Sequence, residues 1–372
     1  MELTRELVAI DSVNPALVEG GAGEREIARF VADWAVERGL EAEIVEEVHG
    51  RPSVIVRARG TGEGRSLLLC AHLDTVGVEG VSDPFDARVD GDRMYGRGAY
   101  DMKSGLASAL LACREAHAAG LSGDVVVAAV ADEEHASIGV QEVLRSVRAD
   151  AAIVTEPTEL EITVAHKGFA WLEIAVTGVA AHGSRPGLGV DAILKMGPIL
   201  TGLGELEQRL GERPHPSLGP GSLHASLIEG GRELSTYPDR CVLALERRTL
   251  PGEQGDAVER EIEALLERCR ADDAELVVES RTLLVRDPFE VDTAAEIVQT
   301  VLTAATDELG TPPPIVSMPY WADSAFIAAA GIPTVLFGAG GTGAHASEEW
   351  VSIADAVSAT RILVAVAGAF CR

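Results

Sequence analysis

Several signatures of common enzyme classes are missing from this sequence of 372 residues. It has no GxxxxGKS/T phosphate-binding loop, no GxSxG nucleophile elbow and no HExxH zinc-binding helix. The motif evidence for a P-loop nucleotide enzyme, an α/β serine hydrolase and a single-zinc protease is therefore absent. Its five cysteines are scattered without a CxxC pair, so we expect reduced structural thiols and neither a disulfide framework nor a zinc ribbon.

Positive charge is also scarce, because 31 Lys and Arg face 59 Asp and Glu, which gives a formal net charge of −28. Nucleic acids and anionic membranes bind through basic patches, so we expect neither as a partner. The N-terminus, MELTRELVAID, lacks the basic and apolar regions of a signal peptide, and the longest apolar run, ILVAVAGAF, is too short to span a bilayer. These features predict a cytoplasmic protein.

The length and the element pattern predict two domains, one inserted into the other. Continuous apolar strands such as 53–60, 66–72 and 124–131 alternate with helical stretches, which is typical of an α/β sheet covered on both faces. The α/β pattern returns after about residue 287. We predict a catalytic domain formed by 1–168 and 282–372, interrupted by an inserted domain at 169–281.

The inserted stretch has a different pattern, with half-exposed strands and two helices. Its predicted elements follow the order strand, helix, strand, strand, helix, strand, at residues 168–178, 190–210, 222–230, 240–248, 253–270 and 274–281. This βαββαβ order predicts a ferredoxin-like unit with both helices on one face of the sheet.

Three adjacent acids, Asp132, Glu133 and Glu134, end the apolar strand at 124–131. Like charges this close repel, and a buried unpaired carboxylate is costly, so a positive partner is expected there. Four further segments also place His or carboxylate residues after an apolar strand or before a helix, namely His72 with Asp74, Asp101, Glu156 and His345. Open α/β sheets form their sites at this edge.

Each of these pieces alone is also typical of ordinary structure. A strand-end His is often hydrogen-bonded, an Asp before a helix is often a cap, and an acidic triplet is often a solvated turn. Their joint occurrence favours a metal site. Two imidazoles and several carboxylates without cysteine suit zinc, and they tolerate manganese or cobalt.

The motifs AHLDTV, YGRGAYDMKSG, ADEE, EPT, AHKG, AAHGSRP and GTGAHASEE occur in this order over nearly the whole chain. In this it resembles the metal-dependent amidohydrolases that include acetylornithine deacetylase, succinyl-diaminopimelate desuccinylase, aminoacylase and glutamate carboxypeptidases. The resemblance implies an aminopeptidase-like catalytic domain with a mixed sheet between helices. It also implies that the inserted ferredoxin-like domain serves as a lid and a dimerisation domain.

The resemblance further implies two divalent metal ions per subunit, most simply zinc. His72, Asp101 and Glu156 would hold one ion. Asp101 would bridge to a second ion, which Glu134 and His345 complete. A hydroxide shared by two such cations is nucleophilic near neutral pH.

The remaining site residues are also assigned by the resemblance. Glu133 is expected to be the general base, because adjacent residues on an extended segment point in opposite directions and can divide the roles of base and ligand. Asp74 is expected to orient the His72 ring. His182 is expected to stabilise the oxyanion in the partner subunit of a homodimer, and Arg248 to bind a substrate carboxylate.

The predicted function is hydrolysis of the amide bond of an N-acyl amino acid, as in acetylornithine deacetylase. Desuccinylase-like, dipeptidase and carboxypeptidase activities remain alternatives, and so does a non-catalytic metal-binding protein on the same fold. Relatives usually carry Asn where this chain has Ser235, Thr236 and Tyr237, which leaves the substrate contacts there open. The acyl group and the amine are not identified by the sequence.

Overall fold

The computed structural model describes residues 1–253 and 256–372. The chain divides into two compact units. Unit 1 comprises Met1–Val164, Val291–Val316 and Ala322–Arg372, and unit 2 comprises Ala165–Glu290 and Ser317–Trp321. The predicted insertion at 169–281 lies inside unit 2, which extends a few residues further at each end and includes the short segment 317–321.

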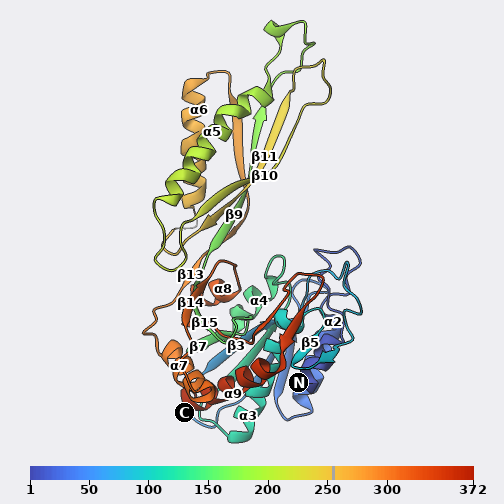
Figure 1. The fold of residues 1–372 in the computed structure, drawn as a ribbon, viewed down its shortest axis with the longest axis vertical. Coiled ribbons are helices and arrows are strands. Elements are labelled where there is room, and N and C mark those ends of the chain that lie inside the picture. Colours follow the sequence, from blue (N-terminus) through green and yellow to red (C-terminus); the bar gives the residue numbers. More distant parts are fainter. Residues whose placement is uncertain (254–255) are drawn as a thin grey trace. The chain divides into compact units, whose positions relative to one another are not determined.

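A mixed nine-stranded sheet is the framework of unit 1 and of the strands that lead out of it, in the order β1-β2-β6-β3-β7-β15-β8-β13, with β14 beside β8 (Figure 1). The central strands β6, β3, β7 and β15 run parallel, and the flanking pairs are antiparallel. Every residue of β3 and β6 is buried, because helices cover both faces, as continuous apolar strands predict. The mixed sheet between helices is confirmed. Its strands are β1 (Glu41–Val45), β2 (Ser53–Ala58), β3 (Leu67–His72), β6 (Val125–Val130), β7 (Ala151–Val154), β8 (Ile162–His166), β13 (Phe289–Glu290), β14 (Ile315–Met318) and β15 (Thr334–Leu336).

The helices of unit 1 are amphipathic or buried segments that cover this sheet. Helix α3 packs against α9, which in turn packs against α7. By length and composition alone α9 could cross a membrane, and its buried side chains belong to the core of unit 1. The helices are α1 (Glu2–Val8), α2 (Arg25–Val36), α3 (Ser104–Ala119), α4 (Ile138–Ser146), α7 (Glu296–Leu309), α8 (Ser324–Ala329) and α9 (Ile353–Phe370), and an irregular turn η1 (Ala99–Lys103) precedes α3.

A small second sheet in unit 1 was not predicted from the sequence. Its order is β16-β17-β5-β4, formed by β4 (Val89–Asp90), β5 (Arg93–Tyr95), β16 (Gly341–Thr342) and β17 (Trp350–Ser352). Strands of two or three residues carry no readable periodicity, so sequence patterns cannot find them. By pairing β5 with β17, the sheet brings the segment around Asp101 next to the segment around His345.

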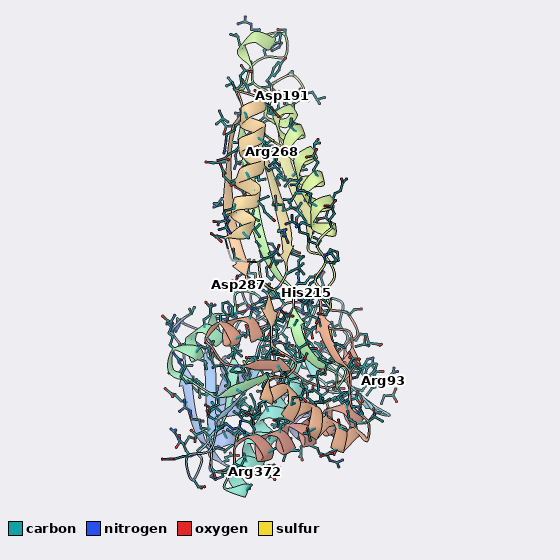
Figure 2. The ribbon with its side chains drawn as sticks, turned by 90° about the vertical axis from the view of Figure 1, so that its left-hand side faces the viewer. Arg93, Asp191, His215, Arg268, Asp287 and Arg372 are labelled. Carbon is teal, nitrogen blue, oxygen red and sulfur yellow. The ribbon has the colours of Figure 1, made fainter. Side chains whose placement is uncertain are left out.

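Unit 2 has an antiparallel four-stranded sheet in the order β10-β11-β9-β12, with α5 and α6 on one face (Figure 1). The elements follow the predicted βαββαβ order. Part of the helix predicted at 253–270 falls on residues 254–255, which lie outside the described residues. Figure 2 labels Asp191, whose carboxylate caps α5 by accepting a hydrogen bond from Leu194 N at 2.9 Å. The bounds are β9 (Gly168–Thr177), η2 (Pro186–Leu188), α5 (Ala192–Gly211), β10 (Ser222–Gly230), β11 (Arg240–Thr249), α6 (Ala257–Asp272) and β12 (Val277–Arg286).

Candidate metal centre

The polar residues predicted to form the metal centre lie together in unit 1. His72 is the last residue of β3, the acidic triplet follows β6, and Glu156 follows β7. Because these three strands are parallel neighbours, their carboxyl ends meet at one edge of the sheet. Asp101 comes from the turn before α3 and His345 from the loop after β16.

The His72 ring is held in the tautomer that a metal ligand needs. Its Nδ1 lies 2.9 Å from the backbone carbonyl oxygen of Asp74, so Nδ1 carries the proton and donates it. The other ring nitrogen, Nε2, lies 3.2 Å from Asp101 Oδ1 and 4.0 Å from Glu156 Oε1, and it would be the ligand atom where a metal ion replaces its proton. The ring is therefore oriented by the carbonyl of Asp74, while the Asp74 carboxylate is further away, at 3.7 Å.

Asp101 stands between the two histidines. One of its oxygens, Oδ1, faces His72, and the other, Oδ2, lies 3.4 Å from His345 Nε2. His345 Nε2 is also 3.1 Å from Glu134 Oε2. The arrangement has two halves that share one carboxylate, each half with its own imidazole and its own glutamate.

Potential ligand atoms are close enough to share an ion. Those of His72, Asp101 and Glu134 lie within 4.8 Å of one another, and so do those of His72, Glu133 and Glu156. The cluster contains no cysteine, so its donors are imidazole nitrogens and carboxylate oxygens, which suit a borderline divalent cation.

The charges of this cluster are unbalanced without a cation. Burial raises the pKa of Glu133, Glu134 and Glu156, and neighbouring carboxylates raise it further. Hydrogen bonds to Asp101 and Glu134 raise the pKa of His345 to about 10. Protons on these groups offset the negative charge, and bound cations would replace them.

The Asp74 carboxylate has a different set of partners from the one predicted. Its Oδ1 accepts the backbone N–H of Glu133 at 3.1 Å, and its Oδ2 accepts that of Glu134 at 3.2 Å. The side chain is buried. Asp74 therefore anchors the backbone of the acidic triplet at the same time as its carbonyl orients His72.

His182 and Arg248, the two other predicted site residues, belong to unit 2. The exposed His182 ring accepts a hydrogen bond at Nδ1 from Ser184 N at 3.2 Å, so its neutral tautomer carries the proton on Nε2 and can donate it. The segment 235–237, where relatives usually carry Asn, pairs with the backbone of this loop. Gly183 N donates to Ser235 O at 2.7 Å, and an antiparallel β-bridge pairs Thr236 with His182.

Strand alternation on β11 separates Arg247 from Arg248. Arg247 is buried and paired with Glu253 at 2.5 Å and Glu261 at 3.3 Å. Arg248 points to the opposite face of the sheet, where it donates to Pro319 O at 2.5 Å and lies 5.4 Å from the centroid of the Phe169 ring. Of the two, Arg248 is the one that a substrate could reach.

Residues 68–369 match the profile described as Peptidase family M20/M25/M40. The chain belongs to this family. The resemblance inferred from the motifs is confirmed, and the protein is an M20-family hydrolase of amide or peptide bonds.

Relatives within the M20 family have more than one activity. The acetylornithine deacetylase of Photorhabdus laumondii is 32% identical over 267 residues, which is 68% of each chain. The N-formyl-4-amino-5-aminomethyl-2-methylpyrimidine deformylase of Bacillus subtilis is 30% identical over 374 residues, covering 91% of this chain and 87% of the relative.

Solved M20-family structures share the fold of the whole chain. The aminopeptidase PepT of Bacillus cereus superposes with a TM-score of 0.80 at 19% identity, covering 99% of this chain and 97% of its own. The YXEP protein of Bacillus subtilis, described as a dinuclear metal binding peptidase, gives a TM-score of 0.76 at 19% identity, with 100% and 97% covered.

A buried ion pair that sequence analysis missed joins the two segments that carry Asp101 and His345. Glu349 Oε2 accepts Arg97 Nη1 at 2.6 Å and Gly98 N at 3.0 Å, while Oε1 accepts Tyr100 N at 2.9 Å and Asp101 N at 3.0 Å. Arg97 Nη2 in turn donates to the carbonyl of Ala346, next to His345, at 2.8 Å. The only sequence signal was the position of Glu349 in the motif GTGAHASEE.

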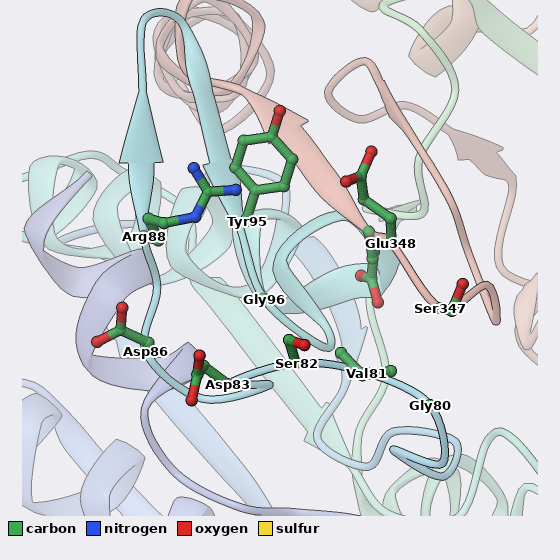
Figure 3. Close-up of a pocket in the computed structure, with 11 residues that line it drawn as sticks. Gly80, Val81, Ser82, Asp83, Asp86, Arg88, Tyr95, Gly96, Ser347 and Glu348 are labelled. Atoms are coloured by element: carbon green, nitrogen blue, oxygen red, sulfur yellow. The ribbon is translucent and has the colours of Figure 1, made fainter.

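Glu349 also forms part of the wall of a pocket of about 360 Å³ in unit 1 (Figure 3). Arg88 stacks over the Tyr95 ring there at 4.1 Å, and Glu348 also lines the pocket. Of the residues described, its lining includes none of the predicted metal ligands. The pocket is therefore a neighbour of the metal centre, and Glu349 is a residue common to the pocket wall and the support of Asp101.

We expect Glu349→Gln to lower the affinity for metal ions by about 10–100-fold, the usual effect of losing a residue that orients ligands. The amide nitrogen of Gln cannot accept hydrogen bonds from Arg97 or from the backbone N–H groups that precede Asp101. Metal affinity is measured by competition with a chromophoric chelator. Glu348→Gln is the matched control because its carboxylate is exposed, and equal affinity in both variants would contradict this role.

Proposed function

We propose that this M20-family protein is a cytoplasmic, metal-dependent deacylase that cleaves the amide bond of N-acyl amino acids. The observation that carries the proposal is the shared carboxylate of Asp101, with each oxygen facing a different histidine. A relative named acetylornithine deacetylase, 32% identical, supports this substrate class. Desuccinylase-like, dipeptidase and carboxypeptidase activities are the alternatives, and a deformylase is added by the Bacillus subtilis relative.

Two divalent ions, most simply zinc with cobalt or manganese as substitutes, fit the residues present. His72, Asp101 and Glu156 would hold one ion, and Asp101, Glu134 and His345 the other. The donor set supports this, because it offers imidazole and carboxylate ligands whose negative charge is otherwise offset by protons. When bound, the ions would supply Lewis acidity that activates water near neutral pH.

Glu133 is proposed as the general base. One of its carboxylate oxygens lies within 4.8 Å of the potential ligand atoms of His72 and Glu156. Its backbone N–H donates a hydrogen bond to the Asp74 carboxylate. From that position its carboxylate accepts a proton from the attacking water and later delivers it to the leaving amine. Glu134, whose Oε2 faces His345, takes the role of ligand.

His182 is proposed to donate from Nε2 to the oxyanion of the reaction in the partner subunit of a homodimer. The edge strand β10 supports a dimer, because within the described part of the chain it has a neighbouring strand on one side only and its Leu227 and Ile228 are exposed. An exposed apolar edge strand pairs readily with a second copy across a two-fold axis.

Arg248 is proposed to bind the free carboxylate of the substrate. Arg248→Ala should raise KM for N-acyl amino acids about 10–100-fold, a usual range for removal of a charge-assisted hydrogen bond of about 1.5–3 kcal/mol. The corresponding amides lack the carboxylate, so their KM should change little. Steady-state kinetics on matched acid and amide substrates measure this. An equal rise in KM for the acid and the amide substrates would assign Arg248 a structural role.

A hydrolysis panel tests the function as a whole. The purified protein, first stripped with a chelator and then reloaded with zinc, cobalt or manganese, is assayed on N-acetyl, N-succinyl and N-formyl amino acids and on dipeptides. We expect activity that disappears with the chelator, returns with metal, and is greatest on an N-acetyl amino acid. A reloaded protein that binds two ions yet hydrolyses none of these substrates would favour the non-catalytic alternative.

A further inference from the structure

Asn14 is the only asparagine in the 372 residues of the sequence. It lies in the loop between α1 and α2, before the residues 68–369 that match the family profile. Its side chain is completely buried. An amide placed in a protein interior must have its hydrogen bonds satisfied, so its partners indicate what the residue does.

The side-chain amide of Asn14 connects two buried carboxylates. Its Nδ2 donates to Asp74 Oδ2 at 2.8 Å and to Asp132 Oδ1 at 3.0 Å. Its Oδ1 accepts the backbone N–H of Ala16 at 2.9 Å. This last bond fixes which end of the amide faces the carboxylates. Both N–H groups and the carbonyl oxygen of the side-chain amide therefore have hydrogen-bond partners.

Both carboxylates bound by Asn14 control the acidic triplet. The Asp74 carboxylate accepts the backbone N–H groups of Glu133 and Glu134 at 3.1 and 3.2 Å. Asp132 directly precedes Glu133 and has a left-handed backbone with φ of 65°. A non-glycine residue in that conformation has to be held by its surroundings.

Arg51 also supports Asp132, at the same carboxylate oxygen that Asn14 contacts. Its Nη2 lies 2.8 Å from Asp132 Oδ1 and 2.6 Å from Glu24 Oε1, and Glu24 accepts the backbone N–H of Asp132 at 3.3 Å. Arg51 and Glu24 are nearly or fully buried. Residues of the N-terminal segment thus hold Asp132, the first residue of the acidic triplet, by charge-assisted hydrogen bonds.

The chemistry at position 14 suits an amide and few other side chains. Two carboxylates 3 Å or less from one nitrogen repel each other unless each receives a hydrogen. A single –NH₂ group supplies one hydrogen to each, without adding a charge. An Asp would add a third carboxylate, and a Leu of similar size would leave both acceptors without this donor.

We propose that Asn14 is a positioning residue, which fixes Asp74 relative to Asp132 and thereby sets the placement of Glu133 and Glu134. The proposal rests on the function proposed above for Glu133 as base and Glu134 as ligand. It extends the catalytic machinery to the N-terminal loop, outside the matched part of the chain.

The test is Asn14→Leu in the full-length, metal-loaded protein. We expect kcat to fall about 100-fold, the effect of a displacement of roughly 1 Å in a catalytic group, with little change in KM. The visible spectrum of the cobalt-substituted protein should change as well, since Glu134 shifts. Ser108→Ala is the matched control, because it removes a buried hydrogen bond to Thr360 in the α3–α9 packing and should change neither quantity.

Asn14→Ser is the second variant, in case the leucine prevents folding. Its hydroxyl retains one donor, so we expect a smaller loss of kcat than for leucine, with a cobalt spectrum that is still altered. If either soluble variant has the kcat and the cobalt spectrum of Ser108→Ala, the proposal is overturned. If the parent protein hydrolyses nothing in the panel, the proposed function fails, and the cobalt spectrum still decides whether Asn14 positions Glu134.

Discussion

Glu133→Gln is expected to keep both metal ions and to lose about 10²–10⁴-fold in kcat, the range that a general acid–base group contributes. The amide is the same size as the carboxylate but cannot take the proton of the attacking water. The backbone of Glu133 stays anchored on Asp74, since that bond uses the main-chain N–H. Metal content by atomic absorption and steady-state kinetics with an N-acetyl amino acid check this result.

Glu134→Gln is the control for the adjacent position. Its Oε2 lies 3.1 Å from His345 Nε2, in the half of the cluster assigned to the second ion. We expect this variant to lose affinity for one ion, with activity that recovers in part at high metal concentration. If Glu133→Gln and Glu134→Gln lose metal to the same extent, the division into base and ligand is wrong.

His182→Ala is expected to lower kcat by about 10²–10³-fold, the usual effect of removing one oxyanion donor, and to leave the metal content unchanged. The physical reason is the tautomer of the ring, because Ser184 N occupies Nδ1 and leaves the proton on Nε2. Kinetics and metal analysis of the purified variant measure both quantities. Ser217→Ala, in another exposed loop of unit 2, is the control and should behave like the parent.

Mixing two inactive variants tests whether the sites are shared between subunits. If His182 serves the partner's site, a dimer of one His182→Ala and one Glu133→Gln subunit has one site with both defects and one with neither. Activity should therefore return in part after subunit exchange. Confirmed exchange without any recovery would show that His182 serves its own subunit or has no catalytic role.

Strand patterns made the fold and the position of the cluster predictable. The buried strands β3, β6 and β7 are read directly from continuous apolar runs, and parallel strands bring their carboxyl ends together. The family motifs added His345, which is separated from the other candidates by the whole of unit 2 in sequence. The small sheet of β4, β5, β16 and β17 was missed because its strands are too short for a period to show.

The supporting hydrogen bonds were much less predictable. Nothing in the motif GTGAHASEE distinguishes Glu349 from Glu348, yet the first is buried against four donors and the second is exposed. Asn14 and Arg51 lie outside the motifs altogether. Their partners lie 27 to 118 residues away in the sequence, because Arg51 is 27 residues from Glu24 and Asn14 is 118 residues from Asp132.

The sequence by itself determined which chemistry is available to this protein. Local apolar runs specify the strands, and the His and carboxylate residues that follow them must meet at the sheet edge, because side-chain period and strand direction are local properties. The tertiary structure decided how each group is used. It is the folded chain that turns the Asp74 carboxylate towards the backbone of the acidic triplet and its carbonyl towards His72, and that buries Arg247 while leaving Arg248 accessible. Those choices depend on contacts between distant segments and on the desolvation that packing imposes, neither of which a linear pattern contains.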